Sequence, residues 1–120
     1  APESFYMVKA CAGPGNCTIT QATAPFDVFL GTKVSYTNYN FGPDASGNVR
    51  MTAAITLTST NPEDTLSGIV SWVYHNGDFT GHISLQSGTG IFEGMHAEGE
   101  IGLTAWPSTF YFSGNYLVAP

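Results

Sequence analysis

Hydrophobic and polar residues alternate along most of this chain, a pattern typical of strands that bury one face. The clearest run covers residues 49–60, in which Val49, Met51, Ala53, Ile55 and Leu57 fall on one side. No long stretch repeats its apolar positions at the helical period of about 3.6 residues. The pattern therefore predicts an all-β chain.

Turn residues divide the chain into eight or nine short strands. The expected strands cover residues 5–10, 18–23, 26–30, 32–41, 49–60, 66–75, 79–86, 91–104 and 109–118. The Asn76-Gly77 pair between two of them is a strong hairpin signal. Short strands in regular succession form an antiparallel barrel or a sandwich. Glycines within several strands favour the barrel, because glycine lets a strand bend or lets its neighbour approach closely.

Residues 87–101 join a Gly-Thr-Gly turn to an alternating strand that is expected to begin at Ile91. Glu93 falls on the same face as Ile91 and Met95, while Phe92 falls on the opposite, exposed face. A carboxylate among apolar side chains is either a hydrogen-bonded structural anchor or a chemical group. The interior around Glu93 is expected to include Met51, Ile55, Val73 and Phe79.

The length of 120 residues suits one domain with one core, so residues 1–120 are assigned to a single barrel. The net charge is −6, and Lys9, Lys33 and Arg50 are the only basic side chains. Three dispersed cations neutralise few phosphates, which argues against nucleic acid and against an anionic membrane surface as partners.

Cys11 and Cys17 enclose the turn-forming residues Ala-Gly-Pro-Gly-Asn. Two thiols on either side of a turn can reach disulfide distance, so we predict a disulfide between them. Two free thiols or a metal site are the alternatives, although no further soft ligand lies nearby. The chain starts Ala1-Pro2-Glu3, which resembles a mature chain after removal of a signal peptide. Together these features predict a secreted protein.

His96, Glu98 and Glu100 lie on one face of a predicted strand, about 7 Å apart. With His75 or His82 they could hold a divalent metal, but the solvent face of a barrel strand is expected to be polar in any case. We favour the solvated face and predict no metal. The glycines Gly88 and Gly90 precede a strand rather than a helix, so no phosphate loop is expected.

The motif Gly88-Thr89-Gly90-Ile91-Phe92-Glu93-Gly94, followed by Phe110-Tyr111-Phe112 and Gly114, resembles the corresponding stretch of plant allene oxide cyclases. Dirigent proteins are similar, with Gly-Thr-Gly-x-Phe at the same place. The resemblance implies a calycin-like, eight-stranded antiparallel barrel with an apolar central cavity. In that family the motif shapes a turn and plugs one end of the barrel.

The resemblance also implies a cofactor-free cyclase or isomerase of secondary metabolism that steers the stereoselective cyclisation of an apolar small molecule. A Diels–Alder or oxa-cyclisation would suit the same scaffold. Confinement would select one substrate conformer, and a carboxylate or dipole would stabilise developing charge. Glu93 and Tyr36 are the expected catalytic residues. The expected substrate-binding residues are Met51, Trp72, Tyr74, Phe79, Met95, Phe110 and Phe112.

Two other functions remain open at this point. The barrel could carry a small apolar ligand without changing it, or it could be a solid interaction protein. The small residues Ala53, Gly81, Ala97 and Gly99 are expected to leave room inside, which favours a ligand. Apolar side chains on outward faces, such as Phe92, predict self-association into a dimer or trimer.

Overall fold

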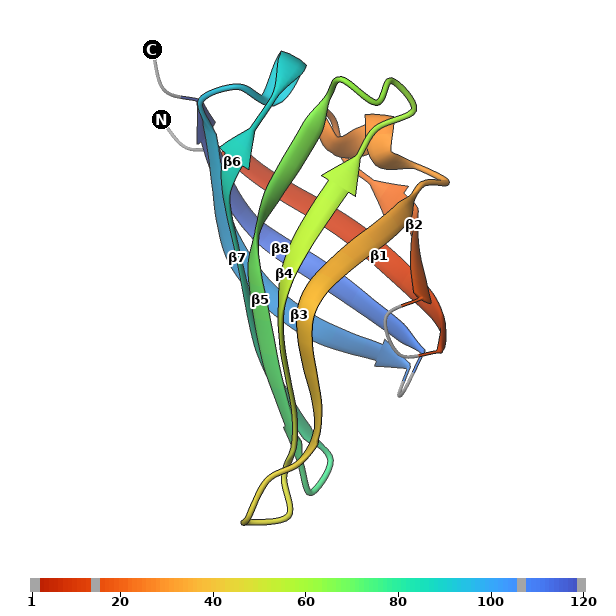
Figure 1. The fold of residues 1–120 in the computed structure, drawn as a ribbon, viewed down its shortest axis with the longest axis vertical. Coiled ribbons are helices and arrows are strands. Elements are labelled where there is room, and N and C mark those ends of the chain that lie inside the picture. The colour runs from red at the N-terminus through yellow and green to blue at the C-terminus, as the bar shows by residue number, and fades with distance from the viewer. Residues whose placement is uncertain (1–2, 14–15, 106–107, 119–120) are drawn as a thin grey trace.

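The structure, a computed structural model, describes residues 3–13, 16–105 and 108–118. The processed start expected at Ala1-Pro2 and the tip of the cysteine loop at residues 14–15 lie outside this part. Eight antiparallel strands form a closed barrel, which confirms the predicted fold (Figure 1). The strands are β1 (Glu3–Gly13), β2 (Asn16–Ala22), β3 (Lys33–Pro43), β4 (Val49–Thr58), β5 (Thr65–His75), β6 (Asp78–Gly88), β7 (Met95–Ala105) and β8 (Thr109–Val118).

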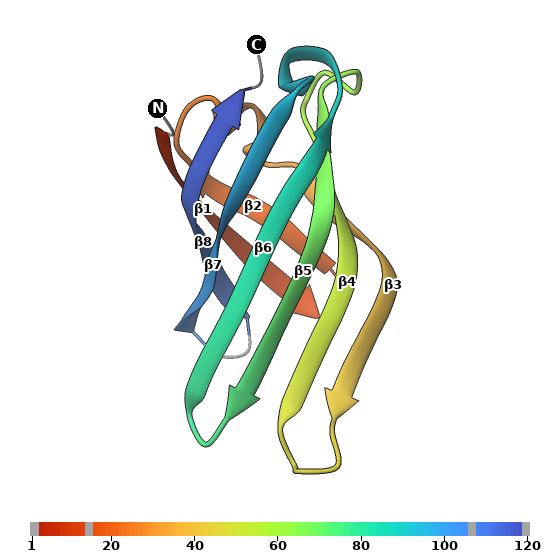
Figure 2. The ribbon, with the colours of Figure 1, turned by 90° about the vertical axis from the view of Figure 1, so that its left-hand side faces the viewer.

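The barrel has two different ends (Figures 1 and 2). At the hairpin end, β3 turns into β4 and β5 turns into β6. Asn76 and Gly77 connect β5 to β6 with φ values of 48° and 85°, the positive values that a type I′ turn requires. At the terminal end lie both chain termini and two short 3₁₀ helices, η1 (Phe26–Phe29) and η2 (Gly90–Phe92).

Stacked aromatic rings fill the interior at the terminal end. Phe26, Phe29 and Phe92 each have 0% exposed surface. The Phe92 ring centroid lies 5.0 Å from that of Phe29 and 6.0 Å from that of Phe26. The predicted strand at residues 26–30 is therefore wrong, because the segment is a 3₁₀ turn that directs two phenylalanines inward. The expected exposure of Phe92 is wrong too, because η2 ends the alternation before β7 begins at Met95.

The side chains of β4 and β5 alternate between the interior and solvent. Met51 and Ile55 point inward with 2% and 0% exposure, as predicted. Val73 does not point inward. Trp72 is the buried residue there, and Val73, as the next residue of β5, faces the opposite side of the sheet. The inward placement expected for Val73 is therefore wrong.

Glycines let neighbouring strands approach closely, as the sequence indicates. Gly99 on β7 lies opposite Gly114 on β8. A Cβ added to Gly99 would lie 2.3 Å from the Ser113 carbonyl oxygen, and one added to Gly81 would lie 2.8 Å from Ile101 Cβ. The expectation that Gly81 and Gly99 leave room for a ligand is consequently wrong, since neighbouring atoms already take that space.

Cys11 and Cys17 form the predicted disulfide. They lie directly opposite each other on β1 and β2, with their Cα atoms 4.0 Å apart. Across the described residues, no helix has both the length and the apolar character needed to span a bilayer.

Candidate functional site

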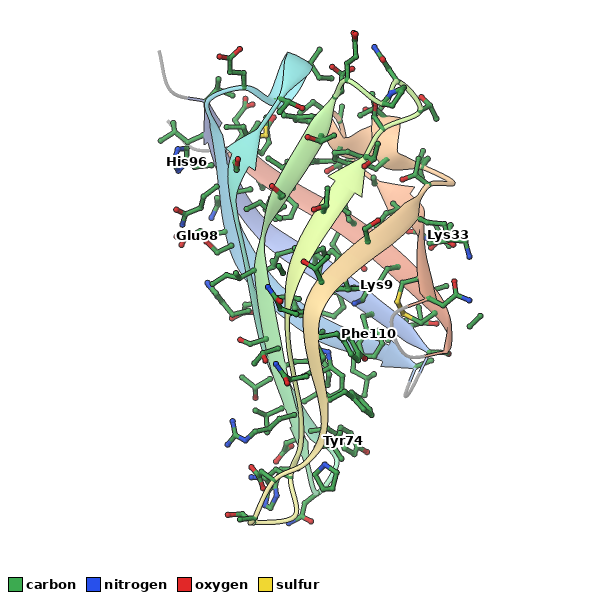
Figure 3. All side chains as sticks on the ribbon, viewed as in Figure 1. Lys9, Lys33, Tyr74, His96, Glu98 and Phe110 are labelled. Carbon is green, nitrogen blue, oxygen red and sulfur yellow. A yellow bond between two sulfur atoms is a disulfide. The ribbon has the colours of Figure 1, made fainter. Side chains whose placement is uncertain are left out.

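Lys9 is buried inside the barrel. Along β1 the inward positions are Phe5, Met7 and Lys9, which expose 3%, 0% and 2% of their surface. Figure 3 places Lys9 in the middle of the molecule, close to Phe110, whereas Lys33 lies on the outer surface. Burying a lysine is costly because its ammonium loses hydration, so it marks this region as a candidate site.

The polar contact of Lys9 is Tyr36 on β3. Lys9 Nζ donates a hydrogen bond to the Tyr36 hydroxyl oxygen. Among the described residues the one ion pair joins Arg50 to Asp44, so no carboxylate there pairs with the lysine. Lys9 is therefore held by a neutral phenol and by its apolar surroundings.

Three aromatic rings surround the amino group. Lys9 Nζ lies 4.9 Å from the ring centroid of Tyr36, 5.1 Å from that of Phe110 and 5.3 Å from that of Phe112. All three distances are within the range of cation–π attraction, which favours the protonated amine. The rings offset part of the cost of burying the charge without neutralising it.

An unbroken series of ring contacts leads from Tyr36 to the hairpin end and returns to Lys9. Successive ring centroids lie 6.0 Å apart for Tyr36–Tyr39, 6.1 Å for Tyr39–Phe41, 5.7 Å for Phe41–Trp72, 5.2 Å for Trp72–Phe79 and 5.4 Å for Phe79–Phe110. We refer to Tyr36, Tyr39, Phe41, Trp72, Phe79 and Phe110 as the aromatic cage. Phe41 is 48% exposed, so the cage reaches the surface.

The cage also lies beside a stretch of β3 that is not paired with β2 among the described residues. Strands β2 and β3 pair at two positions, Cys17–Val34 and Thr18–Lys33. The rest of β3, which carries Tyr36 and Tyr39, pairs with β4 alone among the described strands.

Burial shifts the titration of both polar groups. It lowers the pKa of Lys9 from 10.5 to about 7, because the charged form is desolvated. Burial, and to a lesser degree the neighbouring Tyr39, raises the pKa of Tyr36 above its usual value of 10.0. Near neutral pH the lysine is thus divided between amine and ammonium, while the tyrosine keeps its proton.

This arrangement gives one location two chemical capabilities. A desolvated neutral amine is a nucleophile or base, and the ammonium form stabilises negative charge that develops on an oxygen. The Tyr36 hydroxyl can donate a proton or a hydrogen bond. The apolar surroundings strengthen each of these electrostatic interactions, since less water screens them.

Most of the residues that the sequence assigned to a site lie in or next to the aromatic cage. Tyr36, Trp72, Phe79 and Phe110 belong to the cage, and the Phe112 ring centroid lies 5.3 Å from Lys9 Nζ. Two more lie on the same inward faces. Met51 pairs with Trp72, and Tyr74 pairs with Phe79.

Glu93 and Met95 lie at the opposite end. Glu93 is exposed and directly follows η2, so its expected place in the interior is wrong. Met95 is buried at the start of β7, opposite Val118, and is not part of the cage. The carboxylate that anchors the Gly-Thr-Gly turn is Asp64, whose Oδ1 accepts a hydrogen bond from the Ile91 amide at 3.1 Å.

Lys9 was not among the residues predicted for the site. The signal was present, because Phe5, Met7 and Lys9 share one face of a strand that was itself predicted. A lone lysine on an apolar face, in a chain with three basic residues, indicates a buried amine. The prediction treated Lys9 only as one of three positive charges and did not consider which face of the strand it occupies.

The acidic and histidine cluster of β7 is on the outer surface. His96, Glu98 and Glu100 are exposed, as expected for a solvated face, and Figure 3 shows the first two outside the barrel. A shallow depression of about 370 Å³ is lined there by Gln86, His96, Glu98, Asn115, Tyr116 and Leu117. Within the described part of the chain, no group of three histidine, cysteine, aspartate or glutamate side chains is arranged to hold a metal.

Comparison with known proteins adds no family to this description. No family model, no curated protein and no solved structure matches the chain. The function must therefore be inferred from the site itself.

Proposed function

We propose that this protein is a cofactor-free cyclase or isomerase that binds an apolar small molecule in the aromatic cage. One observation carries the proposal: Lys9 is buried against Tyr36, inside a ring of aromatic side chains that reaches the surface through Phe41. The opposite end of the barrel is filled by Phe26, Phe29 and Phe92, so the proposal places the ligand at the cage. The same activity is implied by the resemblance to allene oxide cyclases and dirigent proteins.

Catalysis would rest on confinement and on two polar groups. Rigid rings restrict a flexible chain to few conformers, so the entropy of cyclisation is lost on binding rather than in the transition state. Lys9 as ammonium and Tyr36 as phenol would then stabilise negative charge that develops on a substrate oxygen. In this proposal the Lys9–Tyr36 pair takes the role that the sequence assigned to Glu93.

We also propose that the protein is secreted and forms a homo-oligomer. The Cys11–Cys17 disulfide supports an oxidising compartment. Ile69, with 66% of its surface exposed, is a more suitable contact for self-association than the buried Phe92. Neither nucleic acid nor a membrane is proposed as a partner, in keeping with the net charge of −6.

The test uses substrates that cyclise slowly without a catalyst. A panel of long-chain epoxy alcohols and linear trienes is incubated with the wild-type protein, and the product isomers are separated by chiral chromatography. We expect one stereoisomer to dominate, and K9M to lower the rate by roughly 100-fold, the typical effect of removing one charge-stabilising group. The matched variant K33M changes the exposed lysine and should leave the rate unaltered.

The same experiment separates the enzyme from the carrier. If panel members bind in the cage but are recovered unchanged, or if their products stay racemic, the cyclase proposal fails. The protein is then the non-catalytic carrier of a small apolar ligand.

A further inference from the structure

Asn16 begins the one N-glycosylation sequence of the chain. In Asn16-Cys17-Thr18 the asparagine is followed two positions later by threonine, and the middle residue is not proline. No other asparagine of the 120 residues has serine or threonine at that distance. This pattern is the acceptor of N-linked glycans in secreted proteins, where the modified asparagine lies at the surface. Whether Asn16 can carry a glycan depends on its place in the fold.

Strand alternation separates the asparagine from the disulfide. Asn16, Cys17 and Thr18 are successive residues of β2, so the side chains of Asn16 and Thr18 lie on one face of the strand and Cys17 on the other. Cys17 is buried, with 2% exposure, and bonded to Cys11, whereas Asn16 is exposed. Thr18 pairs with Lys33, which Figure 3 places on the outer surface. A disulfide inside the barrel and a glycan outside it therefore fit the same folded chain.

The Asn16 side chain has its amide nitrogen available. Its carbonyl oxygen Oδ1 accepts a hydrogen bond from Lys33 Nζ at 2.7 Å. Among the described residues, no hydrogen bond involves Nδ2, which is the atom to which a glycan is attached. An N-linked glycan leaves the carbonyl oxygen in place, so the contact with Lys33 can persist after the modification.

The surface beside Asn16 has room for a bulky group. Gly13 on β1 is the cross-strand partner of Asn16 and has no side chain. A Cβ added to Gly13 meets no atom of the described residues within 4 Å. The chain also has few charged side chains, 10% against about 25% in an average protein, so a hydrated glycan would add to its solubility.

We propose that Asn16 is an N-glycosylation site, which receives an oligosaccharide from a lipid-linked donor when the chain enters the secretory pathway. This inference rests on the proposed secretion and is independent of the proposed cyclase activity. Nδ2 bonds to the anomeric carbon of the oligosaccharide as the bond from that carbon to the lipid diphosphate breaks. The lipid diphosphate leaves with the electron pair, and one Nδ2 proton passes to a base of the transferase. The sum is amide plus lipid-linked oligosaccharide giving glycosylated amide plus lipid diphosphate.

The experiment expresses the chain in eukaryotic cells behind a cleavable signal peptide and analyses the protein recovered from the medium. After denaturation, trypsin cleaves behind Lys9 and Lys33, so one peptide contains Asn16 and both cysteines. We expect this peptide, digested without reduction, to carry one N-linked glycan together with the intact disulfide. Peptide N-glycosidase should remove the added mass and leave an aspartate at position 16.

Four variants control the result. N16Q and T18A each remove one required side chain and should abolish the modification, whereas T18S keeps a hydroxyl and should retain it. D78T creates a second acceptor sequence at Asn76, in the exposed turn between β5 and β6. A glycan on Asn76 in this variant shows that the cells modify this chain.

Secreted wild-type protein without a glycan on Asn16 would overturn the proposal. A glycan present only on chains with unpaired Cys11 and Cys17 would overturn it too, because the glycan and the disulfide would then exclude each other. The signal peptide is supplied, so the result does not depend on whether the chain is secreted by its native cells. Recovery of the protein from inside its native cells would contradict the proposed secretion and leave the measured acceptor activity of Asn16 standing.

Discussion

Lys9 on β1 donates a hydrogen bond to the hydroxyl oxygen of Tyr36 on β3, although β2 lies between these two strands. The ladder between β2 and β3 is short, with two paired positions. The Lys9–Tyr36 contact therefore joins β1 to β3 beyond the two positions at which β2 and β3 pair. One contact thus has a structural role and provides both polar groups of the candidate site.

The first prediction concerns that contact. Y36F leaves the buried amine without its hydrogen-bond acceptor, so the free energy of unfolding should fall by about 1–3 kcal/mol. Y39F is the matched control, because no hydrogen bond among the described residues involves the Tyr39 hydroxyl. Urea denaturation of both variants measures the difference. Equal stability of Y36F and wild type would show that the hydroxyl does not hold Lys9.

Asp64 and Glu93 should respond differently to truncation. Asp64 is 9% exposed and accepts the Ile91 amide hydrogen, so D64A should cost about 1–3 kcal/mol by leaving that amide unsatisfied. Glu93 is exposed, and E93A should change stability by less than about 0.5 kcal/mol. Thermal melts of the two variants decide the assignment, and a larger loss for E93A would reverse it.

The close approach of β7 and β8 gives a third prediction. G99A introduces a methyl group 2.3 Å from the Ser113 carbonyl oxygen, and relieving this overlap should cost about 1–3 kcal/mol. At Gly13 an added Cβ meets no atom of the described residues within 4 Å, so G13A is the matched control and should stay near wild-type stability. Chemical denaturation of the pair measures the effect. Comparable stability of G99A and G13A would contradict the close approach of β7 and β8 at Gly99.

Stability should depend on pH through Lys9. Burial lowers its pKa from 10.5 to about 7, so between these values the unfolded chain binds more protons than the folded one. The free energy of unfolding then rises with pH, because protonating the buried amine opposes folding. Relative to K9M, the wild type should gain up to about 3 kcal/mol between about pH 7 and pH 9.5.

Urea denaturation of the wild type and K9M at several pH values tests this dependence. Tyr36 is present in both proteins and stays mostly protonated up to the end of this window, so its raised pKa contributes little to the difference between them. Parallel pH profiles for the two proteins would mean that Lys9 titrates normally in the folded state.

The sequence predicted the barrel because strands and turns leave local signals. Alternation around Met51 and Ile55 and the positive-φ turn at Asn76-Gly77 depend on neighbouring residues alone, and the structure confirms them. Phe92 and Glu93 were misplaced for the opposite reason. A single 3₁₀ turn before β7 shifts the alternation, and whether a chain makes such a turn depends on the contacts of Phe92 with Phe26 and Phe29.

The sequence predicted the aromatic residues of the candidate site but did not predict its amine, Lys9. Trp72, Phe79 and Phe110 are large enough to indicate a barrel wall from sequence alone. The pairing of Lys9 with Tyr36 joins residues 27 positions apart, and their meeting depends on how β1 and β3 are placed by barrel closure. Local patterns do not encode such a distance.

The most direct test of a buried, reactive lysine is an NMR titration of the Lys9 side chain. The chain has two lysines, so protein labelled with ¹³C at lysine Cε gives two resonances, which K9R and K33R assign. We predict that the Lys9 resonance titrates with a midpoint near a pKa of about 7. A spectrum in which neither lysine resonance moves below about pH 9 would contradict the account.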